Sequence, residues 1–253
     1  MVIIKADQLE VQNIHFGKLE DNALVKSQKL AFISYKEQKE RLMVRTPEFI
    51  TETYGIPREG PFYTTAKSRA FYKIPFCHDR HMYDGEMDYQ HMEVFYNKLR
   101  EIDKHCDTDE FRLQMFGEKF ANKYEYQPLV RHPEEDDTFQ ETGEDISKYY
   151  RPPYTKVKLD LSYGTEKPTF KLYDVSSGEG RKEVDLKSFE DILQYMRFLT
   201  KHRMVIHFSK LYAMKTASGA EKRKYGIILK AFGVECVNKA QRKVHDDADP
   251  FSD

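Results

Sequence analysis

Hydrophobic and polar positions alternate with a period of two along several stretches of this chain. Between 154 and 163, Val157, Leu159 and Leu161 are separated by charged or hydroxyl residues, a pattern typical of a half-buried strand. Two long extended runs, 203–214 and 225–237, flank the polar connector TASGAEKRK and predict the last two strands. Shorter strands are predicted at 29–35, 41–46, 69–77 and 169–175. The first two of these lie at hairpin distance, and Pro75 indicates an edge strand or a strand end.

A helical pattern interrupts the strands. Apolar residues recur at three- and four-residue steps at Met92, Phe95, Leu99, Ile102 and Cys106. This spacing predicts a helix over about 87–104. Asp107 and Glu110 fit an N-cap and its box partner, which predicts a second helix over about 108–122. Ser188 and Asp191 fit the same motif and predict a helix at 188–199.

These elements predict a mainly β (α+β) protein. Six or seven strands, a helical insert at about 87–124 and one helix before the final strands suit a small OB-like β-barrel. Strands and helices do not alternate in a βαβα order, so a parallel doubly wound sheet is not expected. We expect one domain over 1–237 and a disordered acidic tail over 238–253. The acidic stretch 134–145 holds seven acids and no base, so we expect a solvated loop there. Whether 1–147 is a separate domain stays open.

Composition excludes several protein classes. The chain has 253 residues, 40% hydrophobic, with 17 Phe, 17 Tyr and three Cys. An odd, small number of cysteines argues against a secreted disulfide scaffold. No apolar run approaches the roughly 18 to 20 residues of a membrane span, and no signal peptide is apparent. We therefore expect a soluble intracellular protein.

The near-neutral net charge of −1 hides an uneven distribution along the chain. Residues 1–147 contain 20 basic and 28 acidic residues, whereas residues 148–243 contain 21 basic and 10 acidic residues. The last ten residues contain four Asp and no base. A basic region beside acidic segments indicates binding to a polyanion. The alternative is that these charges mix on the folded surface and only solvate it.

Local catalytic and metal-binding motifs are weak or absent. The chain has no G-x-x-x-x-G-K-[ST] loop, no G-x-G-x-x-G and no G-x-S-x-G. Asp84, Glu86 and Asp88 could bind a divalent cation as in a metal-dependent nuclease, or could complement a helix dipole. Residue types of a zinc site occur at Cys77, His78, His81, His91, His105 and Cys106. Their spacing matches no standard knuckle, and Cys106 fits a packed thiol. We expect no catalytic residues, no metal and no cofactor.

Basic residues interleave with aromatic ones on the last predicted strands. From 197 to 230 there are nine bases and one acid. Single-stranded nucleic acid is bound by cations that follow phosphates and by flat rings on which bases stack. Predicted phosphate contacts are Lys156, Lys158, Arg203, Lys210, Lys222, Arg223, Lys224 and Lys230, and predicted stacking residues are Tyr212, Tyr225 and Phe232. Alternation places Met204, Ile206 and Phe208 on the core face, and Lys230 and Phe232 together on one face of the final strand. The alternative is that the rings are core or cross-strand pairs.

The chain ends in DDADPFSD, where Asp246, Asp247, Asp249 and Asp253 surround Pro250 and Phe251. Such a tail can compete for a basic groove or anchor protein partners through Phe251; its alternative role is solubility. It resembles the acidic, Pro-Phe-terminated tails of bacterial and phage single-stranded-DNA-binding proteins, which recruit replication proteins. Ser252 and Asp253 follow Phe251 here. A partner-protein pocket that binds the carboxylate of a C-terminal Phe would therefore not fit this tail.

Residues 154–237 are similar to the OB-fold single-stranded-DNA-binding proteins of nucleocytoplasmic large DNA viruses. The similarity lies in the order KVKLDL, FKLYDV, SFEDILQYM, VIHFSKLYAM and YGIILKAFGVEC. It implies a role in coating exposed strands during viral DNA replication, without catalysis, in the host nucleus or a cytoplasmic viral factory. The prediction is therefore sequence-tolerant binding of single-stranded DNA, with RNA and a homodimer left open. The alternatives are a protein-interaction or virion structural module and a metal-dependent nuclease.

Overall fold

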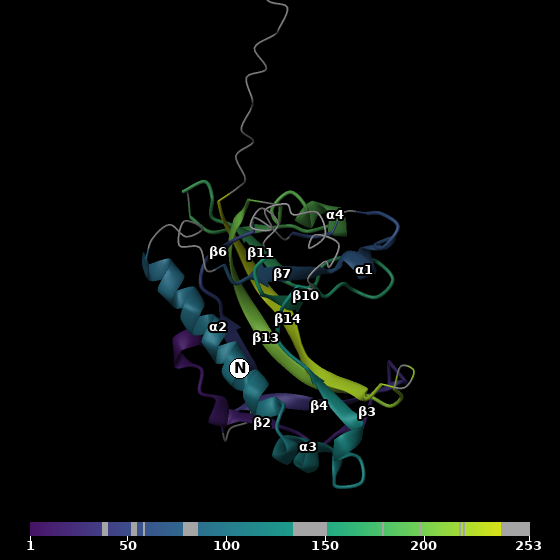
Figure 1. Ribbon diagram of the computed structural model, residues 1–253. Helices are drawn as coiled ribbons and strands as arrows, with labels where there is room; N and C mark the ends of the chain where they lie inside the picture. The colour runs from purple at the N-terminus through teal and green to yellow at the C-terminus, as the bar shows by residue number, and fades with distance from the viewer. Residues whose placement is uncertain are drawn as a thin grey trace, which may run out of the picture.

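The computed structural model describes residues 1–36, 40–51, 55–57, 59–77, 86–133, 151–178, 180–197, 199–217, 219 and 221–238 (Figure 1). Several predicted features lie outside these residues. They are the acidic stretch 134–145, Asp84, His78, His81 and the tail residues Asp246, Asp247, Asp249, Pro250 and Phe251.

Two long antiparallel strands, β13 (Lys201–Met214) and β14 (Arg223–Asn238), form the centre of the fold (Figure 1). They confirm the two extended runs expected from the sequence. Their ladder contains three register shifts, at which one strand carries an extra residue. Bulges of this kind bend and twist a strand pair, in keeping with the strong curvature of this hairpin.

Strands from the first fifth of the chain extend the sheet on the β13 side. Successive segments of β13 pair antiparallel with β4 (Gln28–Tyr35), β5 (Leu42–Arg45) and β6 (Phe49–Ile50). Further out lie β1 (Val2–Lys5) on β5, and β2 (Ile14–Phe16) and β3 (Glu20–Asp21) on β4. β4 and β5 are the strands predicted at 29–35 and 41–46. Each of them pairs with β13, and they do not form a hairpin ladder with each other. An isolated bridge joins Tyr35, at the end of β4, to Glu40, which precedes β5.

On the β14 side, three strands pair directly with β14 in parallel, and antiparallel strands extend the sheet from them. β8 (Tyr124–Gln127), β10 (Tyr154–Lys158) and β11 (Lys171–Asp174) each lie parallel to a different segment of β14. β7 (Phe71–Pro75) and β9 (Val130–Arg131) pair with β10, and β12 (Lys182–Val184) pairs with β11. The main path runs β1-β5-β13-β14-β10-β7, so β7 is a terminal strand, as Pro75 indicated. The result is a curled half-barrel, which confirms the mainly β class.

The helical pair expected from residue spacing is present as α2 (Glu86–Cys106) and α3 (Asp109–Phe116). The N-cap of α3 is Thr108 and not Asp107, because the Thr108 hydroxyl accepts from the Phe111 amide at 3.1 Å. Gly117, with φ of 72°, ends α3 earlier than predicted. The remaining short helices are α1 (Ala66–Arg69), α4 (Phe189–Ile192), η1 (Ala6–Gln8), η2 (Val11–Asn13) and η4 (Ala121–Lys123).

The helix predicted at 188–199 shrinks to the single turn of α4. Its capping box is confirmed, because Asp191 accepts hydrogen bonds from the Ser188 and Lys187 amides. Tertiary contacts hold the residues after the turn, which leave the helical path. The Thr51 hydroxyl donates to Arg197 O at 2.8 Å, and Tyr195 O accepts from His202 Nε2 at 2.8 Å. Long-range contacts here override local helical spacing.

The apolar stripe of α2 packs into the same hydrophobic core as the inward residues of β13 and β14. That core reaches from Ala6 to Val234 in the chain. Cys106 is fully buried in it, as expected for a packed thiol. No helix among the described residues has the length and apolarity needed to cross a membrane.

His202 is buried at the end of β13 in a polar cluster with Tyr72 and Thr200. Burial lowers the pKa of His202 from 6.5 to about 4. The unfolded chain therefore binds a proton that the folded chain rejects, and stability falls as pH drops from about 6.5 toward 4. We expect a loss of about 3 kcal/mol over that window. Urea unfolding across this pH range checks it. His202→Gln should flatten the dependence, and an unchanged profile in that variant would contradict the assignment.

Candidate nucleic-acid interface

The two faces of the central hairpin separate as the alternation predicted. Met204, Ile206 and Phe208 are completely buried, whereas Lys230 and Phe232 lie on the opposite face, which we call the outer face. Phe232 is 43% exposed. The outer face therefore carries cationic and aromatic side chains together, while the other face forms the core.

Two β-bulges shape the outer face. Ser209 is the extra residue of β13 and Phe232 the extra residue of β14, because the ladder passes from Val205–Gly233 to Ile206–Ala231. A bulged residue has no direct cross-strand partner, and bulges commonly re-aim a side chain beside a functional site. Both bulged residues border a hollow of about 710 Å³ on this face. The hollow is also lined by Phe32, Arg41, Asp160, His207 and Lys230.

A row of three lysines crosses β13, β14 and β10 beside this hollow. Lys158 and Lys230 are paired positions of β10 and β14, and Lys210 is on the neighbouring strand β13. Asp160 forms ion pairs with Lys158, at 3.2 Å, and with Lys230. Burial, followed by the charges of Lys230 and Lys158, lowers the pKa of Lys210. One carboxylate thus faces three cations, and the row keeps an excess of positive charge.

Lys156 belongs to a second group of cations at the β7–β10 edge. It lies directly opposite Lys73 of β7, and its Nζ is 3.8 Å from the Phe71 ring centroid. Lys73 Nζ is 4.3 Å from the Tyr154 ring. Burial lowers the pKa of Lys156, and the charges of Arg131 and Lys73 lower it further. Like charges placed opposite each other across strands cost stability, and nearby negative charge reduces that cost.

Sequence reasoning missed Lys73, Arg131 and Phe32. Lys73 and Arg131 are basic residues that lie far apart in the sequence, each on a short strand. Only the pairing of β7 and β9 with β10 brings them close to Lys156. Phe32 is 66% exposed and lies opposite Lys210 on β4. The alternation in KLAFISY could have placed Phe32 and Ala31 on different faces, but the sequence does not say which face is the core.

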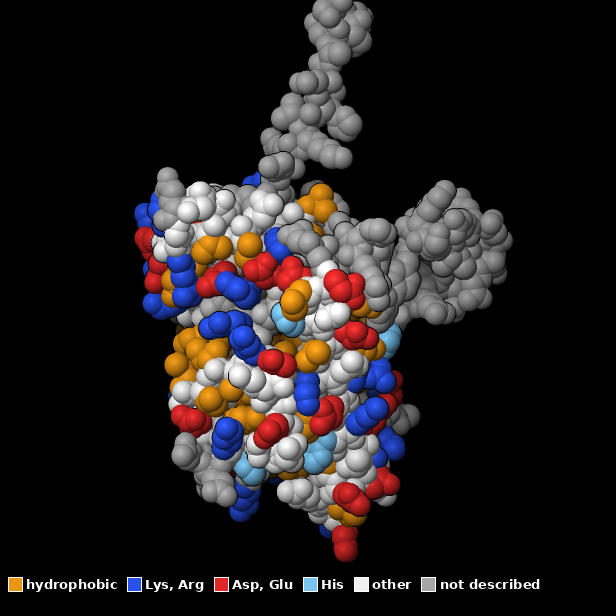
Figure 2. All heavy atoms as spheres, turned by 90° about the vertical axis from the view of Figure 1, so that its left-hand side faces the viewer, with side chains coloured by type: hydrophobic (Ala, Val, Ile, Leu, Met, Phe, Trp, Pro, Cys, Tyr) orange, Lys and Arg blue, Asp and Glu red, His pale blue; other side chains and the backbone are white. Residues whose placement is uncertain are grey.

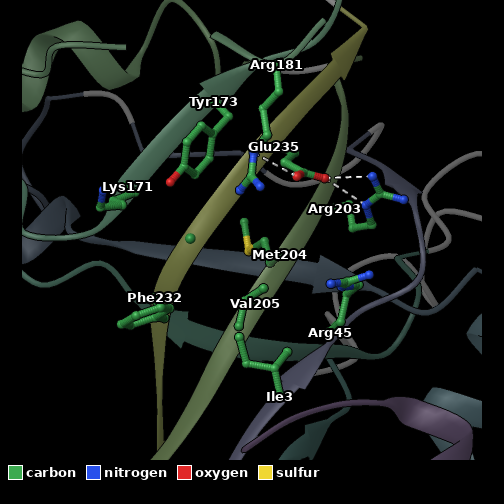
Figure 3. Close-up of a pocket in the computed structure, with 11 residues that line it drawn as sticks. Ile3, Arg45, Lys171, Tyr173, Arg181, Arg203, Met204, Val205, Phe232 and Glu235 are labelled. Carbon is green, nitrogen blue, oxygen red and sulfur yellow. Dashed lines mark hydrogen bonds and ion pairs between the residues drawn. The ribbon is translucent and has the colours of Figure 1, made fainter. Parts of the chain in front are cut away.

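Arg203 lies on the outer face but is engaged by carboxylates. Its Nε and Nη2 contact Glu235 Oε2 at 2.8 and 2.7 Å (Figure 3). Glu48 lies 3.6 Å from its Nη1. Arg181 also contacts Glu235, at 3.2 Å. The predicted phosphate contact of Arg203 therefore has to compete with two neighbouring acids.

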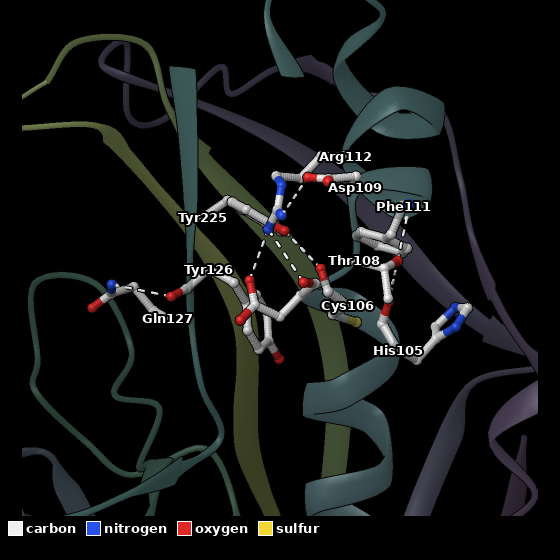
Figure 4. Close-up of polar contacts among 10 residues, drawn as sticks. His105, Cys106, Thr108, Asp109, Phe111, Arg112, Tyr126, Gln127 and Tyr225 are labelled. Atoms are coloured by element: carbon white, nitrogen blue, oxygen red, sulfur yellow. Dashed lines mark hydrogen bonds and ion pairs between the residues drawn. The ribbon is translucent and has the colours of Figure 1, made fainter. Parts of the chain in front are cut away.

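Tyr225 is completely buried, so the prediction that it stacks on bases is wrong. It points inward with Ile227 and Leu229, and its hydroxyl donates to Cys106 O at 2.6 Å (Figure 4). Phe116 and Tyr126 pack on its ring. Tyr212 is half-buried, and its ring lies over Gly226, where an added Cβ would be 3.3 Å from it. Tyr212 remains partly accessible.

The basic residues at the end of the β13–β14 hairpin form a separate group. Lys222 is exposed, Arg223 lies 5.7 Å from the Tyr124 ring, and Lys224 contacts Glu125 at 2.6 Å. Arg223 and Lys230 are seven residues apart on β14, a distance of roughly 23 Å at the usual strand rise. The structure therefore does not bring Lys222, Arg223 and Lys224 together with the lysine row.

The side of the molecule on which α2 lies carries mixed charge. Figure 2 shows basic and acidic side chains interspersed there, with exposed hydrophobic groups between them. Asp88, at the start of α2, lies 3.6 Å from Lys201 of β13. Among the described residues no three His, Cys, Asp or Glu side chains form a metal-binding group.

Comparison with known proteins places this chain near a viral protein. No protein-family model matches the sequence. Over 229 residues, 81% of this chain, it is 24% identical to an uncharacterized protein of Acanthamoeba polyphaga mimivirus. The chain spans 54% of that relative's length, and the relative's name assigns no activity. The similarity supports an origin in a nucleocytoplasmic large DNA virus.

Proposed function

We propose that this protein binds single-stranded nucleic acid, DNA in the first place, on the outer face of its half-barrel and without catalysis. One observation carries the proposal. Two exposed rings, Phe32 and Phe232, stand on the same face as Lys158, Lys210 and Lys230. Exposed aromatic rings beside excess positive charge suit unpaired bases and their phosphates.

In this proposal the strand crosses the sheet. Lys156, Lys158, Lys210 and Lys230 contact phosphates, while Phe32, Phe232 and Tyr212 receive bases. Neighbouring strands lie about 4.8 Å apart. A nucleic-acid strand that crosses the outer face from β4 to β7 can therefore place several nucleotides along these side chains. Stacking makes such binding tolerant of sequence. Residues 154–237 form the OB-like part of this proposal, and the acidic tail tunes occupancy and recruits replication proteins.

The test is fluorescence anisotropy with a labelled 30-nucleotide oligo-dT, matched duplex and matched RNA at two salt concentrations. We expect tight, salt-sensitive binding to the single strand. A chain ending at Val244, which lacks the four aspartates of the acidic tail, should bind more strongly than the full chain. No binding by either chain at low salt would overturn the proposal and would direct attention to a protein partner.

Phe32→Ala tests the stacking part. A stacked base contributes about 1 to 3 kcal/mol, so we expect oligo-dT affinity to fall about 5- to 150-fold. Phe120→Ala is the matched control, because Phe120 is 38% exposed and has Lys119 and Lys123 over its ring, on the loop after α3. Both affinities are measured by anisotropy. An equal loss of oligo-dT affinity in the two variants would contradict binding of the strand on the outer face.

A further inference from the structure

A small cavity of about 140 Å³ opens on the outer face beyond the lysine row (Figure 3). We call it the arginine pocket. Its walls include Ile3, Arg45, Tyr173, Arg181, Arg203 and Phe232, from β1, β5, β11, β13, β14 and the segment before β12. Phe232 also borders the larger hollow, so the two spaces adjoin at its ring.

One side of the arginine pocket is flat and apolar. Phe232, at its bulge, lines this side together with Val205 and Ile3. Gly233 is the direct partner of Val205, and a Cβ there would meet only Lys171 O, at 3.8 Å. The absence of a side chain at Gly233 therefore leaves open space in the wall of the pocket, at the residue that follows Phe232. A planar ring of a ligand can enter that space and pack face to face with Phe232.

The other side of the pocket is cationic. Glu235 contacts Arg203 at 2.7 Å and the Nε of Arg181 at 3.2 Å, so both guanidinium groups lie on this side of the pocket. The Arg181 guanidinium is held 3.6 Å from the Tyr173 ring centroid. Arg45 is exposed, and no ion pair among the described residues uses it. Guanidinium groups offer paired donors that match phosphate oxygens.

We infer that the arginine pocket binds one nucleotide of the bound strand, with its base on Phe232 and its phosphate on Arg45 and Arg181. The inference rests on the proposed function and adds a site to it. An apolar slot beside a group of arginines matches a planar base joined to an anion. The larger hollow lets the rest of the strand continue from Phe232 toward Lys230.

The test uses thymidine 5′-monophosphate as the probe, followed by ligand-observed NMR at low ionic strength. Thymidine and ribose 5-phosphate are the controls that lack the phosphate and the base. We expect each control to bind at least fivefold more weakly than the nucleotide. Arg45→Ala and Phe232→Ala should each weaken nucleotide binding at least fivefold. Gly233→Leu, which fills the slot, should abolish it.

Two matched variants separate this pocket from the rest of the face. Lys5→Ala removes the same charge at the position paired with Arg45, and Phe120→Ala removes an exposed ring on the loop after α3. Neither residue lines the pocket. We expect both variants to bind the mononucleotide like the unaltered protein. Thermal unfolding of each variant shows whether it is folded.

The outcomes distinguish the pocket from the proposed function. Binding of oligo-dT without detectable nucleotide binding, or nucleotide binding that Phe232→Ala and Gly233→Leu leave unchanged, would overturn the pocket and keep the proposed function. Loss of nucleotide binding in Phe232→Ala with full oligo-dT affinity would show that the pocket takes free nucleotides, and would overturn its place on the strand. Failure of both ligands to bind would overturn both.

Discussion

Replacing Lys158, Lys210 and Lys230 together with glutamine should weaken oligo-dT binding by about two orders of magnitude at low salt. The three lysines form a row across neighbouring strands, and Asp160 forms ion pairs with two of them, Lys158 and Lys230. Each phosphate contact to a single strand releases counterions and changes the slope of log affinity against log salt by about 0.7. Removal of three contacts should therefore reduce the slope by about 2.

The salt dependence distinguishes lost contacts from lost folding. Glutamine keeps most of the length of lysine and can still donate to Asp160, so the thermal unfolding temperature should change little. The matched control replaces Lys104, Lys119 and Lys187 with glutamine, since all three are exposed and lie off the outer face. An equal loss in the control, or an unchanged slope in the first variant, would show that the lysine row does not contact the strand.

Asp103→Ala should reduce the free energy of unfolding by about 3 to 5 kcal/mol. Asp103 of α2 accepts hydrogen bonds from the Leu129 amide at 2.7 Å, the Val130 amide at 3.0 Å and the Tyr126 hydroxyl at 2.9 Å. Burial raises the pKa of Asp103, while these three donors oppose that shift. Removing the carboxylate leaves three buried donors unsatisfied, and each costs about 1 to 3 kcal/mol.

Urea unfolding at neutral pH measures this effect. Asp103→Asn should fall between the two proteins, because one oxygen remains and the new amide group faces a backbone donor. Asp109→Ala is the control, since the Asp109 side chain is 92% exposed although it contacts Arg112 at 2.7 Å. We expect it to change stability by less than about 0.5 kcal/mol. A loss of that small size in Asp103→Ala would show that water replaces the three hydrogen bonds.

The sequence alone determined the elements whose pattern is local. The alternation along β13 and β14 correctly separated Phe208 from Lys230 and Phe232, because a strand places successive side chains on opposite faces. The stripe on α2 predicted its buried apolar residues for the corresponding reason, with a period of 3.6, but it did not predict the burial of Asp103. The capping box at Ser188 and Asp191 was also readable, since its partners are three residues apart.

Which segments meet depends on contacts between residues that are far apart in the sequence. Alternation could not show that Tyr225 lies beneath Phe116 and Tyr126, because their contacts join residues about a hundred positions apart. Lys73 and Lys156 are likewise brought together by the β7–β10 ladder, and Phe32 is assigned to the outer face by its pairing with Lys210. The bulge that exposes Phe232 is a property of the ladder between two strands, so neither strand encodes it alone. The direction of a side chain follows from its position in its own strand. Which strands pair is determined by the burial of the whole core, to which distant segments contribute.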